Sequence, residues 1–280
     1  MPAQRTLSQK QNEVSLTKFL QSLGRITRSF FFSFTAVLKL LGQTLYWILV
    51  GPFRKKPLSG ENFFAQTVFS GFDSLLIVFF VDFFIGMVLA MQSAYQLEQM
   101  GATIYVAALV AVSMTREIGP VLTSLVIAGR VGAAITAQLA TMKVTEQVEA
   151  LETISLNPVR YLVVPRFLAL LIMLPCLVMV GDMVGMLGGF VVGTMNLGLT
   201  PGIYIDTTIE FLTNKDILTG LLKSAVFGMI ITMIACHQGL STEGGAEGVG
   251  RATTKSVVLS FILIIIADAI MTAVFYFAKT

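Results

Sequence analysis

Residues 74–94 read SLLIVFFVDFFIGMVLAMQSA, a run in which Asp82 is the only charged residue. A helix that crosses the hydrocarbon core of a bilayer needs about 20 mostly apolar residues, because the core is about 30 Å thick and each residue rises about 1.5 Å. The run therefore predicts a membrane-spanning helix. The composition agrees, since 55% of the 280 residues are hydrophobic and only 12% are charged, about half the charged share of a soluble domain.

Further apolar runs of spanning length follow the first one. They cover residues 104–140, 161–192, 217–236 and 256–277. The short connections between them leave no room for a separate soluble domain, so we predict an all-α integral membrane protein with one five-helix transmembrane domain over residues 61–280. The run 104–140 is too long for one straight crossing, and Gly119-Pro120 predicts a break or kink within it.

Residues 1–60 are predicted to form an N-terminal cytoplasmic and interfacial region. Within residues 30–50, apolar side chains recur at helical spacing and polar ones interrupt them. This amphipathic pattern, with Tyr46 and Trp47 near its end, favours a helix that lies in the cytoplasmic interface. A spanning helix over the same residues is the alternative.

Basic residues predict which connections face the cytoplasm. Lys and Arg precede the first run and also lie in or beside the connections 141–157 and 239–255. By the positive-inside rule these regions are cytoplasmic, and five crossings then place the C-terminus outside. The net charge of +3 is too small to indicate a nucleic-acid partner.

Motifs of soluble enzymes fail on inspection. Residues 245–250 read GAEGVG and have the glycine spacing of a phosphate loop, but Arg251-Ala252 stands where a Lys and a Ser or Thr are needed. His237 is the only histidine and has no HExxH partner, and the sequence contains no GxSxG elbow. We therefore expect no catalytic residue, no metal site and no bound cofactor.

Charged residues inside the apolar runs are the candidates for a functional site. Each charge at mid-bilayer costs about 2.5–3.5 kcal/mol, so such side chains need partners or water. Lys223 and Asp268 lie roughly 9 and 14 Å from the outer ends of their runs, while Arg116 and Glu117 lie roughly 18 Å into theirs. We expect these four to meet, either as stabilising ion pairs or as a functional cluster. Pro120 should free the backbone carbonyl of Arg116 beside them.

The connection after the second run, about residues 141–156, has the pattern of a short two-faced helix. Acidic residues recur every three positions on one face, and apolar residues occupy another. The acidic face contains Glu146, Glu149 and Glu152, and the apolar face contains Val144, Val148 and Leu151. Such a helix either docks a partner or remains an ordinary solvated loop helix.

An ordered set of short motifs covers about residues 65–280. They are GMVL at 86–89, TREIGP at 115–120, AGRVG at 128–132, TEQ at 145–147, NP at 157–158, KS at 223–224 and RATT at 251–254. In this set the sequence resembles the MlaE family, permeases that work with MCE-domain proteins in ABC-type lipid transport. Asp82 fits no motif of that family.

The resemblance implies an architecture and a set of partners. It implies five spanning helices after an interfacial helix, a permease homodimer, two cytoplasmic ATPase subunits that hydrolyse ATP, an MCE assembly on the outer side and a phospholipid-like substrate. It implies the inner membrane of a Gram-negative-type bacterium, with a plastid inner envelope as the alternative. For the short acidic helix, with Glu146, Gln147, Glu149 and Glu152, it implies the coupling helix that fits a groove on the ATPase.

Other functions remain open from the sequence. An ion-coupled secondary transporter would use Asp82, Glu117, Lys223 and Asp268 as a proton relay. The absence of a convincing internal repeat weighs against it, since repeats are common in secondary transporters. A structural membrane scaffold would explain the apolar runs but neither the buried charges nor the acidic helix.

Overall fold

The computed structural model describes residues 35–51 and 60–277. Helices account for the ordered structure of these residues, and no strand occurs among them. Five helical runs are long and apolar enough to cross a membrane: Gly60–Glu98, Thr103–Val144, Val159–Met195, Asn214–Leu240 and Gly245–Phe277. The structure thus confirms an all-α fold with five membrane-spanning helices.

The first three spanning runs are interrupted helices. The first consists of α2 (Gly60–Ser70), a short 3-10 turn, and α3 (Leu75–Glu98). The second consists of α4 (Val106–Ser113), α5 (Gly119–Ile127) and α6 (Ala133–Val144), separated by π-helical turns η4 (Met114–Ile118) and η5 (Ala128–Gly132). The third begins with the π-helical turn η6 (Val159–Val163) and continues as α8 (Val164–Met195).

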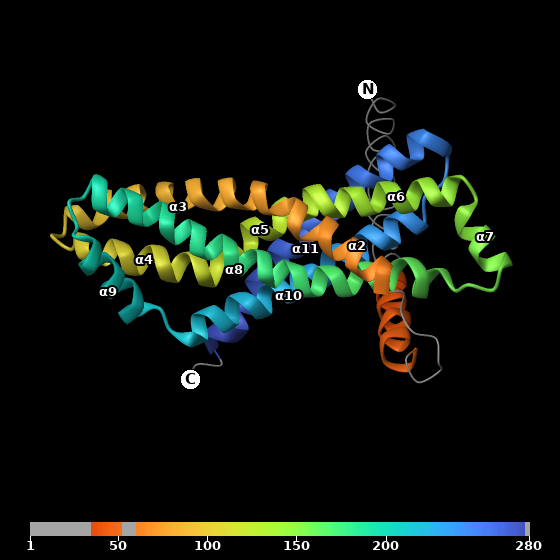
Figure 1. The fold of residues 1–280 in the computed structure, drawn as a ribbon, viewed down its shortest axis with the longest axis horizontal. Coiled ribbons are helices and arrows are strands. Elements are labelled where there is room, and N and C mark those ends of the chain that lie inside the picture. The colour runs from red at the N-terminus through yellow and green to blue at the C-terminus, as the bar shows by residue number, and fades with distance from the viewer. Residues whose placement is uncertain (1–34, 52–59, 278–280) are drawn as a thin grey trace, which may run out of the picture.

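The remaining spans are continuous helices, α10 (Asn214–Leu240) and α11 (Gly245–Phe277). Two short helices connect spans: α7 (Gln147–Thr153) follows the second, and α9 (Pro201–Phe211) follows the third. In Figure 1, α7 and α9 lie at opposite ends of an elongated bundle, and the connection from α10 to α11 lies toward the end that carries α7. This arrangement is the one expected if α7 and that connection share one side of the membrane.

The buried core lies between the second, third and fourth spans. Its fully buried side chains include Ile127, Ile135, Leu139, Phe167, Leu170, Leu174, Phe227 and Ile231. In contrast, α11 buries only Gly248, Ser256, Ser260 and Ile264. Phe261 and Ala267 also pack against the core, but one side of the helix, which includes Val258, Ile262, Ile266 and Ile270, is exposed. Helix α11 therefore offers a long apolar surface to lipid or to another protein.

The first and third spans approach each other through small residues. A Cβ atom on Gly86 of α3 would overlap the carbonyl oxygen of Gly185 in α8, and one on Gly188 would overlap the carbonyl oxygen of Phe83. Without side chains at these positions, the two backbones pack in direct contact, as small residues permit in membrane helices. The same close approach brings Asp82 beside α8.

The helix Thr35–Val50 lies across the long axis of the bundle (Figure 1). It packs on the core through Leu40, which is buried, and Thr44 is buried beside it. At about 1.5 Å per residue the described helix rises about 24 Å, less than the hydrocarbon thickness. Residues 30–34 of the expected amphipathic helix lie outside the described residues, and its interfacial position stays a prediction.

The sequence did not predict two helices, α2 and α9. Helix α9 begins where Thr200 accepts a hydrogen bond from the backbone N–H of Ile203 at 3.4 Å, and Pro201 stands in its first turn. Tyr204 anchors it, because this buried ring lies against Gly189 and Gly193 of α8. Desolvation raises the pKa of the Tyr204 phenol to about 12, so the ring stays neutral in this contact.

Cysteine labelling tests the predicted orientation of the bundle. A cysteine at Thr145, beside α7, should react only from the cytoplasmic side of a sealed membrane, and one at Thr280 only from the outer side. The reason is that three of the five spanning helices lie between these two positions. A membrane-impermeant maleimide measures this directly. Reaction of both cysteines from the same side would exclude the five-span topology.

Candidate functional site

A π-helical turn carries the first two candidate residues. In η4 the N–H of Gly119 bonds to the carbonyl of Met114, five residues earlier, so the turn holds one more residue than an α-helical turn. The helix does not break at Pro120, which stands in the first turn of α5, where a missing N–H is tolerated. The expected break or kink therefore appears as a change of hydrogen-bond register, and it presents Arg116 and Glu117 at the bundle surface.

Lys223 is the centre of a charged cluster between η4, α10 and α11. Its side chain is only 1% exposed, and its Nζ lies 2.5 Å from Glu117 Oε2 and 2.8 Å from Asp268 Oδ1. It also donates a hydrogen bond of 2.7 Å to Thr272 Oγ1, which lies 3.2 Å from both carboxylate oxygens of Glu117. The buried ammonium thus donates hydrogen bonds to Glu117 and Thr272. With Asp268 it forms an ion pair in which Asp268 Oδ1 has no hydrogen-bond partner among the described residues.

Arg116 does not join this cluster, contrary to the expectation that all four charges meet. Adjacent residues of a helix point in different directions, so Arg116 turns away from Lys223 while Glu117 faces it. Its guanidinium Nη1 lies 3.6 Å from Asp216 Oδ1, beyond hydrogen-bond distance, and its side chain is 35% exposed. Arg116 is therefore a partly accessible cation, whereas the neighbouring Lys223 is buried among its partners.

Sequence reasoning missed two partners of these charges, Asp216 and Thr272. The apolar run expected over residues 217–236 excludes Asp216, but this residue is buried in the first turn of α10, where it closes a capping box with Thr213. The capping pattern was the available signal, because Thr213 precedes an acidic residue at the third helical position. Thr272 follows Asp268 by one helical turn, and that spacing is the signal that would have placed it beside the same lysine.

Each π-helical turn of the described residues contains an arginine. Arg116 lies in η4, Arg130 in η5 and Arg160 in η6. Arg130 donates hydrogen bonds to the carbonyl of Phe69 at 3.1 Å and to Ser74 Oγ at 2.5 Å, and so holds the junction between α2 and α3. This arginine belongs to the AGRVG motif, and its contacts give it a structural role.

The short acidic helix exists and is shorter than expected. Helix α7 covers Gln147–Thr153, with Val148 buried and Leu151 packed on the core. Glu149 accepts a hydrogen bond from Lys143 at the end of α6, and this contact holds the pKa of the Glu149 carboxyl below its ordinary value. The apolar face is thus docked on the protein's own bundle, and Glu149 of the acidic face is tied to Lys143.

Glu146 forms the backbone turn between α6 and α7. Its φ of 59° lies in the left-handed region, which non-glycine residues rarely adopt, and it directly precedes α7. Glu146, Gln147 and Glu152 are all exposed. The four predicted coupling residues therefore lie on one short segment, and Glu149 is the only one of them that is partly buried.

Charge reversal at this segment tests whether it binds a partner. Lys at both Glu146 and Glu149 is expected to weaken association with a basic docking partner about tenfold or more, because like charges across an interface cost several kcal/mol. Since Glu149 also bonds Lys143, the pair Glu146→Lys and Glu152→Lys separates loss of docking from loss of that internal contact. Glu98→Lys is the matched control, because Glu98 is exposed at the C-terminal end of α3, at the end of the bundle opposite to α7. Pull-down with unchanged partner yield in both double variants would remove α7 from the interface.

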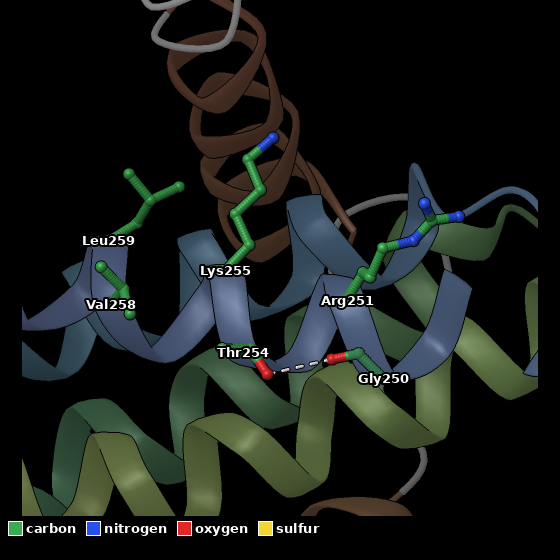
Figure 2. Close-up of a pocket in the computed structure, with 6 residues that line it drawn as sticks. All are labelled: Gly250, Arg251, Thr254, Lys255, Val258 and Leu259. Carbon is green, nitrogen blue, oxygen red and sulfur yellow. Dashed lines mark hydrogen bonds between the residues drawn. The ribbon is translucent and has the colours of Figure 1, made fainter. Parts of the chain in front are cut away.

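Arg251 and Thr254 of the RATT motif line a pocket in the first part of α11. Figure 2 shows Arg251 and Lys255, one helical turn apart, extending from the same side of the helix, while Thr254 turns back to the carbonyl of Gly250 at 3.2 Å. Arg251 also forms an exposed ion pair with Glu247 at 3.7 Å, a kind of contact that contributes little stability. These two cations mark the end of α11 near α7, in agreement with the charge pattern used for topology.

Comparisons with known proteins agree on one family. Residues 63–274 match the sequence model described as "Permease MlaE". A Rickettsia felis protein named "Probable ABC transporter permease protein" is 44% identical over 259 residues, which cover 92% of this chain and 94% of that protein. The Haemophilus influenzae "Intermembrane phospholipid transport system permease protein MlaE" is 34% identical over 265 residues, 93% of this chain and 98% of that protein. The Arabidopsis thaliana protein "TRIGALACTOSYLDIACYLGLYCEROL 1, chloroplastic" is 34% identical over 237 residues, 85% of this chain and 66% of that protein.

Proposed function

This chain belongs to the MlaE family of permeases, and from that premise we propose that it is the membrane subunit of an ATP-driven transporter that moves phospholipid between the inner membrane and an outer-side MCE-domain protein. The names of its relatives support this proposal, since one is a phospholipid transport permease and others are ABC transporter permeases. ATP hydrolysis belongs to two separate cytoplasmic subunits, and this chain supplies no catalytic residue.

One observation carries the lipid proposal most directly. Arg116 lies inside a spanning run, is partly exposed and has only a loose partner in Asp216 at 3.6 Å. A lipid phosphate offers the oxygen pair that a guanidinium binds bidentately. The neighbouring Glu117, Lys223 and Asp268 are paired with one another, so Arg116 is the cation that remains for an anionic headgroup.

The proposed assembly uses separate surfaces of the chain. The exposed acidic side of α7, with Glu146, Gln147, Glu149 and Glu152, docks the ATPase at the cytoplasmic end. The outward apolar face of α11, which includes Val258, Ile262, Ile266 and Ile270, supports a homodimer in which a second copy covers part of it. We place the assembly in a bacterial inner membrane; the chloroplastic relative makes a plastid inner envelope the alternative.

The ion-coupled alternative receives less support from the geometry. A relay through Glu117, Lys223 and Asp268 needs groups that exchange protons, yet both carboxylates form ion pairs with the same buried ammonium. That arrangement stabilises one fixed charge state of the three groups. The cluster therefore suits a structural role beside a lipid site.

The test is purification of the intact complex from its own membrane. We expect an ATPase subunit, an MCE-domain protein and phospholipid to copurify with the tagged chain, and the reconstituted complex to transfer lipid between membranes only when ATP is hydrolysed. A chain that purifies without an ATPase and moves lipid or ions on a cation gradient would contradict the proposal.

A further inference from the structure

Two carboxyl groups are buried together where α3, α5 and α8 meet. Asp82 of α3 is fully buried and Asp182 of α8 is 7% exposed. Asp82 Oδ2 accepts a hydrogen bond of 3.0 Å from Thr123 of α5. The other oxygen of Asp82, Oδ1, and Oδ1 of Asp182 are buried without a hydrogen-bond partner among the described residues.

Glycines bring the two carboxyl groups to the same face of α5. A Cβ atom on Gly181 would overlap Asp82 Oδ2, and one on Gly119 would overlap Asp182 Oδ1. Gly119 and Thr123 are one helical turn apart on α5, so the two carboxyl groups contact sites about 5.4 Å apart along that helix. Gly181 also directly precedes Asp182 in the chain, so the two carboxyl groups lie close enough for their charges to repel each other.

The charged residues of the neighbouring elements lie nearest to other partners. Helices α4 and α5 contain no charged residue. In η4, Arg116 is partly exposed and lies 3.6 Å from Asp216 of α10, and Glu117 pairs with Lys223 of α10. No cation of these elements compensates the carboxyl pair.

The remaining basic residues near these helices are also distant or engaged. Arg130 lies at the α2–α3 junction, where it pairs with Asp73 at 3.9 Å. Arg166 bonds to the carbonyl of Leu162 and lies about 24 Å along α8 from Asp182, by the rise of a helix. The two carboxyl groups are thus an acidic pair without a counter-ion in the described part of the chain.

We propose that Asp82 and Asp182 form a proton-binding site inside the membrane, in which the two carboxyl groups together hold at least one proton at neutral pH. Two like charges that share one buried site disfavour double ionisation, and a proton on one of the two free Oδ1 atoms removes the repulsion. Neither the charge cluster around Lys223 nor the docking helix α7 takes part in this site.

A metal cation fits the geometry less well than a proton. Calcium needs 6–8 oxygen ligands and magnesium a near-octahedral set. The described residues contain no group of three or more acidic, His or Cys side chains that could hold a metal ion, and the only further side-chain oxygen bonded to the pair, that of Thr123, already donates to Asp82. The backbones of Gly181 and Gly119 lie directly against the two carboxyl groups and leave little space there for a hydrated cation.

Infrared spectroscopy of the full-length protein in lipid nanodiscs tests the site. We expect a carboxylic-acid C=O band at neutral pH that shifts in D2O and on labelling of aspartate with carbon-13, and that is lost in the double variant Asp82→Asn, Asp182→Asn. Asn has the size of a neutral Asp and accepts the Thr123 hydrogen bond, so the variant should fold. Asp206→Asn, at an exposed position of α9, is the matched control and should keep the band.

Thermal unfolding provides an independent readout. The folded protein holds a proton that the unfolded chain releases at neutral pH, so stability should fall as pH rises. We expect the unfolding temperature of the wild type to drop by several degrees from about pH 6 to about pH 9 and the double variant to lose most of that slope.

Three results would overturn the proposal. The first is a wild-type protein without any aspartic-acid band at neutral pH, which decides the question even if the double variant fails to fold. The second is a double variant that keeps both the band and the pH slope. The third is stabilisation of the wild type, but not of the double variant, when sodium or calcium replaces a large organic cation at constant ionic strength, because that would assign the site to a metal ion.

Discussion

Replacing Lys223 alone by methionine is expected to lower the stability of the protein by about 3–5 kcal/mol, the usual cost of leaving a buried charge without its partner. Lys223 is 1% exposed and contacts both Glu117 and Asp268. Methionine fills the volume of the lysine stem but leaves these two carboxylates facing each other without a cation. Unfolding in a mild detergent, followed by temperature or denaturant, measures the loss.

A second substitution should recover most of that stability. With Asp268→Leu added to Lys223→Met, the buried attraction and its desolvation cost disappear together, while Glu117, whose side chain is 39% exposed, remains hydrated. Lys215→Met, at an exposed position of the same helix, is the control for removal of a lysine. A single variant as stable as the wild type would show that the cluster contributes no net stability.

The same double variant separates stability from transport. If the cluster only stabilises the bundle, a folded double variant should transfer lipid at the wild-type rate in reconstituted membranes. If the cluster takes part in transport, the variant should fold and fail. The two roles predict the same unfolding curve, so lipid transfer is the measurement that distinguishes them.

The apolar runs made the spanning helices predictable, because length and hydrophobicity alone select a segment for the bilayer. Helix ends were less predictable. Helix α2 extends the first span back to Gly60, where the sequence is amphipathic and the apolar pattern gives no boundary. Helix α9 depends on Tyr204 packing against two glycines of α8, a tertiary contact that no local pattern contains.

The sequence predicted how deep in the membrane the charged residues of the candidate site lie, but not toward which neighbouring helix each side chain points. Counting residues placed Glu117, Lys223 and Asp268 at heights where they meet, and the structure brings these three together. The same counting placed Arg116 with them, although the π-helical turn directs it to Asp216. Likewise, Asp82 and Asp182 lie far apart in the sequence, and only the glycine contact between α3 and α8 shows that they form a pair.

Replacing Arg116 by alanine is expected to reduce lipid bound to the purified complex about tenfold to a hundredfold. A hydrogen-bonded charged contact contributes about 1.5–3 kcal/mol, and each 1.4 kcal/mol is a factor of about ten in affinity. Arg116→Lys should restore only part of the binding, because lysine keeps the charge but not the two parallel N–H donors that match a phosphate. Quantitative lipid extraction followed by mass spectrometry gives the occupancy.

Asp216→Asn is the informative partner variant for this measurement. Asn retains the capping oxygen at the start of α10 but removes the carboxylate that lies 3.6 Å from Arg116. If Arg116 binds a lipid phosphate, loss of this competing anion should leave lipid occupancy unchanged or raise it, and the effect should vanish in the Arg116→Ala background. Equal lipid occupancy in the wild type, Arg116→Ala and Asp216→Asn, each with an intact unfolding transition, would remove Arg116 from the lipid site and reduce its role to an ion pair at the start of α10.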